Sequence, residues 1–433
     1  MNNLVTKAFI TITALSIFTL TYLTIQAVEI QTKQLIIEKT QNQLITIRDS
    51  KKQQITAYLT SLHKQIQSYA YDKNIIAAMY DLKQAFFQVE KPTNKQRDVM
   101  LKYYDNFADD YLLTPSKLDE QTIIMQYRYV AYNQILTDKY HQLHEIHHNY
   151  IKKLQHDIED ILLVDAETGM VIYSANKNLD FATSLKKTSL KDPLNNIFQQ
   201  VNSSNQTKII DFSPYLPLHN THVAFIGTPI LLNKQKIGVL VLQINHDYIN
   251  NIMTYNKKWE FEKSGNTGES YIVAIDDTMR SDSRKLIEYK EDYLLAVEQV
   301  GLPNDIVTKI NLKNTSIGLQ TVNTSGTEAV FMDITGLDLY IDYNDEFVFA
   351  AFTPLNIFGL KWAVFTTIQE SEVLELVTKF TDKIANTIIQ VAVIILIIAS
   401  IILWLIIPTK PSVTPKGYTV KQIVEHINKL NCE

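Results

Sequence analysis

The histidines between positions 141 and 148 are the residues whose types and spacing most resemble a metal site. His141, His144 and His148 share one helical face, because residues three and four apart are neighbours on a helix. Zinc requires three or four ligands and a supporting outer shell, and this spacing offers about two ligands at once. We therefore assign no metal ligand and no cofactor, and expect a surface or packing role for these side chains and for His147. A pH-sensing role stays open, since histidine titrates near neutrality.

A second chemistry-bearing stretch contains two glycines. Gly265-Asn-Thr-Gly268-Glu-Ser-Tyr271 is suited to a turn that leads into a strand beginning at Tyr271. Arg280, Asp282 and Arg284 are expected to clamp this turn through charge-assisted hydrogen bonds. A structural role is favoured over ligand contact. A nucleotide-binding loop is excluded, because no Gly-Lys-Ser/Thr and no glycine run opens a helix here.

Catalytic patterns are missing from the sequence. There is no Gly-x-Ser-x-Gly, no His-Glu-x-x-His and no kinase signature. The adjacent carboxylates of Asp276 and Asp277 follow a strand, where solvation is the ordinary explanation. With 41 basic and 46 acidic residues, the net charge is −5, which argues against a nucleic-acid-binding protein. We expect a protein that is not an enzyme.

Two apolar runs are candidate membrane-spanning segments, and they determine where the other parts of the chain lie. No charged residue occurs from Ala8 to Val28 or from Ile384 to Ile407, and each run exceeds the roughly 20 residues that cross a bilayer. The first run could instead be a cleaved signal peptide, since Lys7 supplies a basic flank. It is longer than a typical signal-peptide core, however, and Gln26-Ala27-Val28 lacks a small-x-small cleavage pattern. Two transmembrane helices are therefore expected.

The basic residues beside these runs predict their orientation. Lys7 precedes the first run, and Lys410, Lys416 and Lys421 follow the second. Positive charge favours the cytoplasmic side, so both termini should be cytoplasmic and residues 29–383 should be exported. The single cysteine, Cys432, then lies in the reducing compartment, and a segment as large as 29–383 needs no disulfides.

The exported segment begins with a helical pattern. From Glu29 to about Phe87 there is no glycine or proline, and apolar residues recur in steps of three and four at Ile55, Leu59, Leu62, Ile66 and Tyr69. This long amphipathic helix must pack on the folded domain, on a second copy of the chain, or on both. Further helices are expected at 95–112, around Met125–Tyr129, and at 138–155.

After His156 the apolar period becomes two, which predicts strands. A first strand set is expected at 161–165, 170–174, 208–212, 222–232 and 237–244, with turns at Gly169 and at 233–236. A helix at 249–259 should connect it to a second set at 271–275, 318–322, 329–334, 347–353 and 362–368. A final helix at 370–380 should lead into the second span.

Several stretches in this order resemble the double Cache sensory domains of bacterial chemoreceptors, sensor histidine kinases and nucleotide cyclases. The most specific are Gly265–Val273 and Met279-Arg-Ser-Asp-Ser-Arg284. Gln126-Tyr127, Asp180–Leu185, Asp211-Phe-x-Pro-Tyr215 and Phe352–Ala363 also match, so the resemblance covers most of 29–380. The departures are His144-x-x-His147-His148-Asn149, where the family has His-x-x-Tyr-His-Pro, and Ser264-Gly265-Asn266, where it has Gly-Leu-Gly.

The resemblance implies an α+β fold: a long N-terminal helix plus two PAS-like (Cache) antiparallel-sheet modules, flanked by two transmembrane helices. The expected boundaries are a cytoplasmic N-terminus at 1–7, spans at 8–28 and 384–407, a stalk helix at 29–90, a membrane-distal module at 91–260, a membrane-proximal module at 261–383, and a cytoplasmic tail at 408–433. The location implied is the bacterial inner membrane, with the sensor part periplasmic or extracellular.

The resemblance also implies a receptor that binds a small solute in its distal module and passes the signal across the membrane. The candidate ligand-binding residues are aromatic or charged side chains expected near that pocket: Tyr127, Arg128, Tyr129, Tyr173, Asp180, Asp211 and Tyr215. An arginine would pair with a ligand carboxylate, and an aspartate would accept from an ammonium group. The alternative is that these tyrosines are ordinary core or rim residues. The family's amino-acid pattern is not cleanly present, so amino acids, carboxylates and amines all stay open.

The expected partners are this solute, membrane lipid, a second copy bound through the long helix, and a separate cytoplasmic signalling protein; nucleic acid is excluded. The segment after Ile407 is shorter than the roughly 40 residues of a small domain, and Thr419 should cap a helix from Val420 to about Leu430. The chain could therefore be the truncated sensor part of a chemoreceptor, histidine kinase or adenylate/diguanylate cyclase. A third alternative is an exported structural protein with a non-sensing Cache fold.

Overall fold

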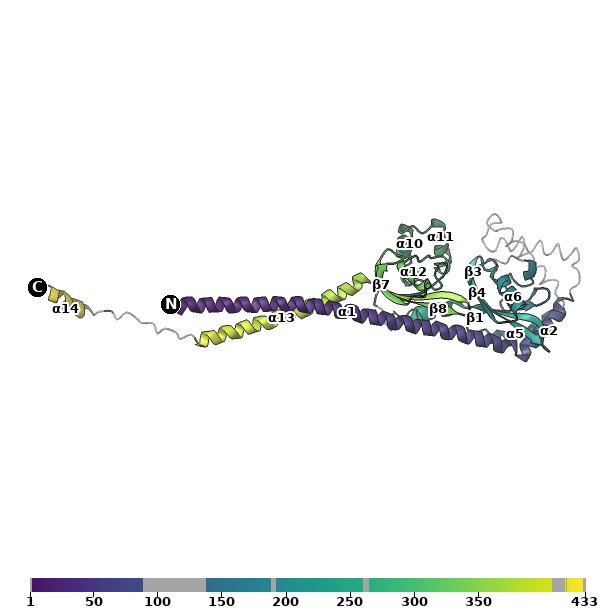
Figure 1. Ribbon diagram of the computed structural model, residues 1–433, viewed down its shortest axis with the longest axis horizontal. Coiled ribbons are helices and arrows are strands. Elements are labelled where there is room, and N and C mark those ends of the chain that lie inside the picture. Colours follow the sequence, from purple (N-terminus) through teal and green to yellow (C-terminus); the bar gives the residue numbers. More distant parts are fainter. Residues whose placement is uncertain are drawn as a thin grey trace. The chain divides into compact units, whose positions relative to one another are not determined.

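A computed structural model describes residues 2–88, 138–187, 192–259, 265–406, 417 and 419–430. The chain divides into two compact units (Figure 1). One contains residues 36–375, and the other contains residues 1–35 together with 376–433. The helices expected at 95–112 and around Met125–Tyr129 lie outside the described residues, and with them the candidates Tyr127, Arg128 and Tyr129.

The long helix predicted at 29–87 is two helices. The first, α1, spans Asn2–Ala70, and the second, α2, spans Lys73–Phe86. Between them Asp72 is extended, and its side chain accepts a hydrogen bond of 2.6 Å from the backbone N–H of Asn74. Aspartate is a strong helix N-cap, so it starts a new helix in a stretch that contains no glycine or proline. The prediction of one unbroken helix is wrong at this point.

The distal sheet has the strands that the sequence predicts. They are β1 (Ile158–Asp165), β2 (Val171–Ser174), β3 (Lys208–Tyr215), β4 (Thr221–Leu232) and β5 (Gln235–Ile244), in the antiparallel order β2-β1-β5-β4-β3. Gly169, with φ 69°, makes the β1–β2 turn as expected, and Asn233 and Lys234 turn β4 into β5 with positive φ.

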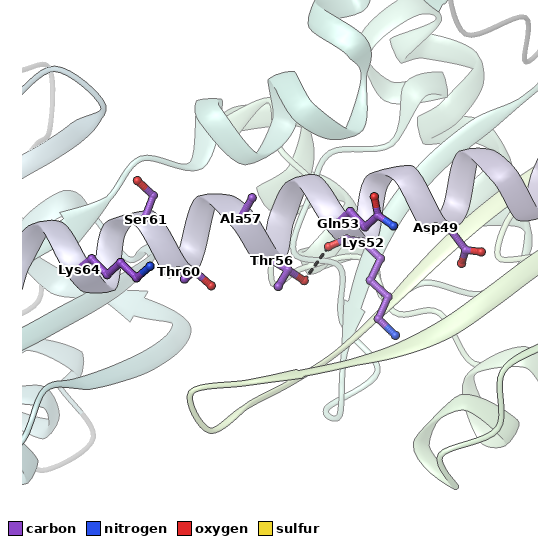
Figure 2. Close-up of a pocket in the computed structure, with 8 residues that line it drawn as sticks. All are labelled: Asp49, Lys52, Gln53, Thr56, Ala57, Thr60, Ser61 and Lys64. Carbon is purple, nitrogen blue, oxygen red and sulfur yellow. Dashed lines mark hydrogen bonds between the residues drawn. The ribbon is translucent and has the colours of Figure 1, made fainter.

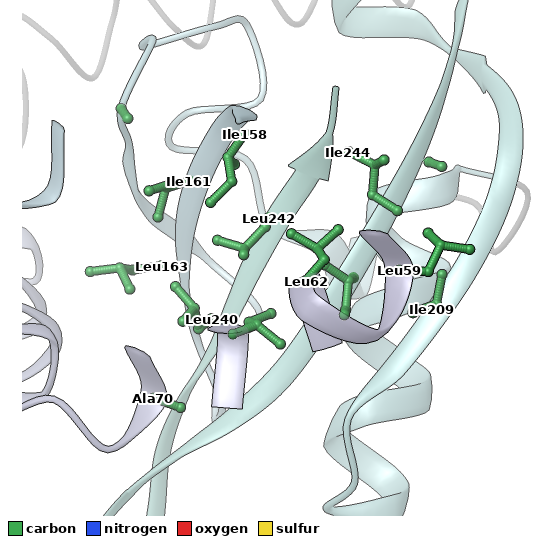
Figure 3. Close-up of a cluster of buried hydrophobic side chains, with 14 of the residues drawn as sticks. Leu59, Leu62, Ala70, Ile158, Ile161, Leu163, Ile209, Leu240, Leu242 and Ile244 are labelled. Carbon is green, nitrogen blue, oxygen red and sulfur yellow. The ribbon is translucent and has the colours of Figure 1, made fainter. Parts of the chain in front are cut away.

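Helices cover both faces of the distal sheet. On one face lie α1, α2 and α5 (Asp138–Lys153), and the apolar stripe of α1 packs there, including Leu59 and Leu62, against Leu240 and Leu242 (Figure 3). On the other face lies α6 (Pro193–Ser204), through Ile197 and Phe198. The stripe that could have required a second copy of the chain is thus buried against the chain's own sheet.

The proximal module departs from the prediction in the stretch of chain between its first strand and the strand expected at 347–353. Its strands are β6 (Glu269–Ala274), β7 (Gly336–Ile341), β8 (Phe347–Ile357) and β9 (Leu360–Gln369), in the antiparallel order β6-β9-β8-β7. Residues 318–322 form only an isolated bridge at Thr321, and the strand expected at 329–334 is replaced by helix α12 (Ser325–Phe331). A capping box between Thr324 and Thr327 starts this helix, which explains why the apolar run that follows is not a strand.

The proximal sheet is also covered on both faces. The helices α9 (Arg284–Glu288), α10 (Lys290–Gln299), α11 (Asn304–Lys313) and α12 follow β6 in the chain. They pack on one face through Leu286, Tyr293, Ile310 and Val330. On the other face α1 contributes Leu44, beside Phe349 and Ile368. One helix therefore packs on both sheets, which couples the two modules mechanically.

The remaining elements connect these parts. The helix expected at 249–259 is α7 (His246–Met253), followed by the short turn η4 (Tyr255–Lys257). Two other short turns are η2 (Leu185–Lys187) and η3 (Leu216–Leu218). The distal core continues into the proximal sheet through Ile272, Trp362 and Val364, so the modules share one hydrophobic cluster.

Within the described residues, two helices are long and apolar enough to cross a membrane, by length and composition: α1 near its N-terminus, and α13 (Glu370–Ile406). The helix expected at 370–380 thus runs without a break into the second apolar run. The predicted tail helix is confirmed as α14 (Val420–Leu430). Thr419 precedes it, and the Gln422 side chain accepts a hydrogen bond from the Thr419 N–H. The fold class expected from the sequence, a long helix with two antiparallel sheets, is confirmed.

Candidate functional site

Four of the candidate ligand residues are in the described part of the chain, and the structure brings two of them together. Tyr215 Oη donates a hydrogen bond of 2.6 Å to Asp180 Oδ2, and both side chains are buried. Tyr173 belongs to a different group, with its hydroxyl 2.9 Å from His148 Nδ1. Asp211 forms an ion pair with Arg280. These four candidates therefore do not form one constellation.

Asp180 is held inside the distal module by the edge strand β2. The segment that follows it pairs with β2 through Ala182 N to Val171 O and Val171 N to Thr183 O, each 2.9 Å. Ala182 adopts φ 62°, a conformation that costs a non-glycine residue energy. This pairing leaves the Asp180 side chain with almost no contact with solvent.

Three carboxylates and one phenol form what we call the acidic cluster: Asp160, Asp180, Asp192 and Tyr215. Burial raises the pKa of Asp160 to about 6. Burial, and then the neighbouring carboxylate of Asp160, raise the pKa of Asp180 to about 7. Burial also raises the pKa of Asp192. Within the described residues no ion pair joins any of the three to a basic side chain.

The three carboxylates differ in how they are satisfied. Asp160 accepts from Ser174 Oγ at 2.8 Å and from its neighbour's N–H, and Asp192 caps α6 by accepting from Asn195 N–H. Among the described residues, Asp180 Oδ1 has no hydrogen-bond partner, and neither has Thr183 Oγ1. A buried carboxylate oxygen without a donor is unstable as an anion. An incoming ammonium group would supply both the missing donor and the missing positive charge.

The histidine group lies on the α5 face that meets β2. The rings of His144 and His148 stack with centroids 4.9 Å apart, and Tyr173 and Tyr140 surround them. Burial, and then the charge of Lys177, lower the pKa of His144 to about 4, so this imidazole is uncharged at neutral pH. His147 instead contacts Asp81 of α2 at 3.0 Å. Among the described residues no group of three or more His, Cys, Asp or Glu could hold a metal ion.

The glycine turn is clamped as expected, but by one of the three predicted residues. Arg284 Nη1 donates to the carbonyls of Gly265 and Gly268, at 3.1 and 2.6 Å, and Gly265 has φ 76°. Arg280 and Asp282 do not contact this turn. Asp282 accepts from Asn250 of α7 and from Thr315, and Arg280 reaches the distal module. The prediction that all three clamp the turn is wrong for these two, because their side chains connect modules instead.

The same turn holds the start of α13. The carboxylate of Glu372 accepts hydrogen bonds from the N–H groups of Asn266 and Thr267, both 2.8 Å, and from Thr267 Oγ1 at 2.6 Å. Burial acts to raise the pKa of Glu372, but these donors outweigh burial and hold the pKa below its usual range. We call this arrangement the Glu372 latch.

A second connection joins the two modules. Arg280 Nε and Nη2 donate to the two oxygens of Asp211, at 2.8 and 3.0 Å, and Nη2 also reaches Asp276. Trp362 Nε1 of β9 donates to Asp211 Oδ1 at 3.0 Å. Asp211 therefore links β3 of the distal sheet to the proximal sheet, a position that suits signal transfer better than ligand contact.

Grooves line the exposed side of α1. One, of about 700 Å³, is bordered by Asp49, Lys52, Gln53, Thr56, Ala57, Thr60, Ser61 and Lys64 (Figure 2). These side chains are polar or small, and Thr56 Oγ1 bonds back to the Lys52 carbonyl. No aromatic and no large apolar side chain borders this groove, whereas such side chains line most small-molecule pockets.

Comparisons with known proteins find likeness in structure only. No protein-family model matches the sequence, and no curated protein matches it. The ligand-binding domain of the Pseudomonas fluorescens chemoreceptor CtaA, solved with L-isoleucine, matches with 10% identity, 79% coverage of this chain, 98% coverage of that chain and a TM-score of 0.36. The corresponding domain of Campylobacter jejuni Tlp3, in complex with 4-methylisoleucine, matches with 11% identity and a TM-score of 0.39. The match covers 78% of this chain and 94% of the Tlp3 chain.

A third match is the ligand-binding domain of the Pseudomonas aeruginosa chemoreceptor PctB in complex with L-Arg. The two sequences are 10% identical, the match covers 64% of this chain and 92% of the PctB chain, and the TM-score is 0.32. All three of these structures are ligand-binding domains of chemoreceptors.

Sequence reasoning missed three residues that complete these sites. Asp160 lies among the acidic residues that precede the apolar run of β1, where nothing marks its carboxylate as buried. Asp192 precedes Pro193, an Asp-Pro pair that is typical of a helix start and could have located α6. Glu372 is one of several acidic residues around the start of α13, and only the fold shows that it reaches Thr267.

The acidic cluster predicts a pH dependence of stability. A carboxylate whose pKa is raised in the folded state contributes stability that is present below its unfolded pKa and is lost as pH rises through the folded pKa. The unfolding free energy of the ligand-free protein should therefore fall between about pH 4 and 7. In Asp180→Asn this fall should be weaker, by at most about 1.4 kcal/mol per pH unit. Denaturant titrations at pH 5, 6, 7 and 8 measure it, and parallel pH profiles for both proteins would contradict it.

Proposed function

We propose that this protein is a membrane-anchored sensor whose distal module binds a small solute that carries a protonated amine. The observation that supports this most directly is Asp180, a buried carboxylate with one oxygen that lacks a donor. Asp160 and Asp192 add negative potential around it. A cationic ligand group relieves both the missing hydrogen bond and the repulsion between carboxylates. Amines and amino acids are therefore favoured over simple carboxylates.

In this proposal the signal leaves the ligand site through contacts between the modules. Asp180 bonds Tyr215 at the end of β3, and Asp211 of the same strand bonds Arg280 and Trp362. Arg280 and Arg284 lie in one stretch of chain, and Arg284 holds the turn that the Glu372 latch joins to α13. Ligand binding would favour one packing of these contacts and so bias the position of α13.

The proposed topology has residues 29–383 outside the cell membrane and both termini in the cytoplasm. Lysines precede the first apolar run and follow the second, and positive charge favours the cytoplasmic side. Its role would be binding and signalling, with no catalytic step. A homodimer would form through the exposed polar face of α1 in Figure 2, since the apolar stripe of α1 is buried in the chain's own core. A separate cytoplasmic protein would read the tail.

A thermal-shift screen of the purified full-length chain tests the ligand class. The panel contains amino acids, amines, carboxylates and purines, including L-isoleucine and L-arginine, with which the matched chemoreceptor domains were solved. A ligand at 100 times its Kd should raise the Tm by roughly 5–10 °C. The Tm should rise with an amine-bearing compound, and this increase should vanish in Asp180→Asn.

The matched control is Asp247→Asn, since that side chain is 73% exposed in the same module. It should leave the shift unchanged. A shift that persists in Asp180→Asn would place the ligand elsewhere, and a shift with carboxylates alone would contradict the proposed ligand class.

A further inference from the structure

The tail helix α14 has one apolar face that nothing in the described chain covers. Val420, Ile423, Val424 and Ile427 recur at the spacing of one helical face, and their side chains are 47–77% exposed. Lys421, Gln422, Glu425 and His426 occupy the positions between them. A helix this short is marginally stable alone in water, so its apolar face requires a surface.

Charge and chain length favour one surface. Between Ile384 and Val424 the chain contains Lys410, Lys416 and Lys421 and no acidic residue. The linker from 407 to 419 spans at most about 45 Å, so if α13 crosses the bilayer, α14 is held close to the lipid headgroups. Basic residues near an anionic leaflet each favour binding, and the apolar side chains can enter the headgroup–acyl boundary.

A protein partner is less well supported by the same residues. A coiled coil requires three to four heptads, and α14 has 11 residues. The basic linker also matches the negative charge of the cytoplasmic leaflet. We propose that α14 docks on the cytoplasmic surface of the anionic membrane through Val420, Ile423, Val424 and Ile427. This rests on the proposed topology and is independent of the ligand site.

Docking would give the sensor an output element at the membrane surface. A displacement of α13 would then change how firmly the tail is held, and a docked helix would conceal its apolar face from cytoplasmic proteins. The lysines that favour docking, Lys416 and Lys421, are also the residues through which a charge change would release the tail.

Lipid quenching on the full-length chain in nanodiscs tests this. In a Cys432→Ser background, Ile427→Cys and the matched polar-face variant Glu425→Cys carry an environment-sensitive fluorophore, and the lipids carry a nitroxide. We expect strong quenching at position 427 and little at 425 in discs with anionic lipid. Adding Lys421→Gln should lower the ratio of docked to free tail about fivefold.

Equal quenching at both positions, or none at either, would overturn the proposal. So would a shielded position 427 that lipid does not quench, because this outcome indicates a protein partner. Labelling of Cys432 in the wild-type chain with a membrane-impermeant maleimide reports the topology separately. Reaction only after the cells are opened supports a cytoplasmic tail, and reaction in intact cells overturns it. The ligand screen can fail without changing either result.

Discussion

Replacing Glu372 with glutamine should release the start of α13 from the glycine turn. The carboxylate accepts three hydrogen bonds from Asn266 and Thr267, and an amide can replace neither the charge nor all of the acceptor capacity. Hydrogen bonds to a charged group contribute about 1.5–3 kcal/mol. Exchange of the Asn266 and Thr267 backbone amides with deuterium should accelerate roughly 10- to 150-fold. Mass spectrometry of the turn peptide measures the change.

Two further variants sharpen this test. Glu370→Ala removes a carboxylate from the same helical turn and should leave both amides protected. Gly265→Ala should resemble Glu372→Gln, because a Cβ at position 265 would lie 2.5 Å from Glu372 Oε1. If the amides exchange at the same rate in Glu372→Gln and in the wild-type chain, the latch does not hold the turn.

Replacing Arg280 with methionine should destabilise the protein by about 3 kcal/mol. The guanidinium is buried, at 3% exposure, and satisfies Asp211 and Asp276 at once. The side chains of Asp211 and Asp276 are 30% and 54% exposed, so water compensates their charges in part. The main loss is that of the hydrogen bonds to the charged guanidinium, which contribute about 1.5–3 kcal/mol. Asp211 would keep only the indole N–H of Trp362 as a side-chain donor. Denaturant unfolding, followed by tryptophan fluorescence, measures the loss.

The matched control is an exposed ion pair of the same module. Lys309 and Asp305 are 2.9 Å apart, with side chains 51% and 67% exposed, and Lys309→Ala should cost less than about 0.5 kcal/mol. Arg280→Lys should be intermediate, because an ammonium cannot replace a forked pair of donors. Equal losses for Arg280→Met and Lys309→Ala would show that the modules do not depend on this connection.

The sequence predicted the distal sheet better than the proximal one for a physical reason. Strands β1, β4 and β5 are bounded by clear turns and have long apolar runs. In the proximal module, Ala329 and Val330 have strand-like neighbours, but the capping box at Thr324 makes the segment a helix. Strand β7 was missed because it is an edge strand with exposed Leu339 and Ile341 interrupted by acidic and aromatic residues.

The acidic cluster could be predicted only in part. Asp180 and Tyr215 were found through the motifs that surround them, whereas their contact depends on β2 and β3, which are far apart in sequence. Asp160 and Asp192 belong to the cluster only because the fold buries them near Asp180, and no local sequence pattern around either residue predicts this proximity. Tyr127, Arg128 and Tyr129 lie outside the described residues, so their ligand role stays a prediction.

Proton release on ligand binding tests the central claim most directly. Because the pKa of Asp180 is about 7 in the ligand-free protein, this carboxyl is mostly protonated at pH 6 and must lose its proton to pair with an ammonium group. Calorimetry of the full-length chain in buffers of different ionisation enthalpy should show about one proton released at pH 6, about half a proton at pH 7 and almost none at pH 8. Asp180→Asn should release none. Binding at pH 6 without proton release, or with proton uptake, would contradict an ammonium site at Asp180.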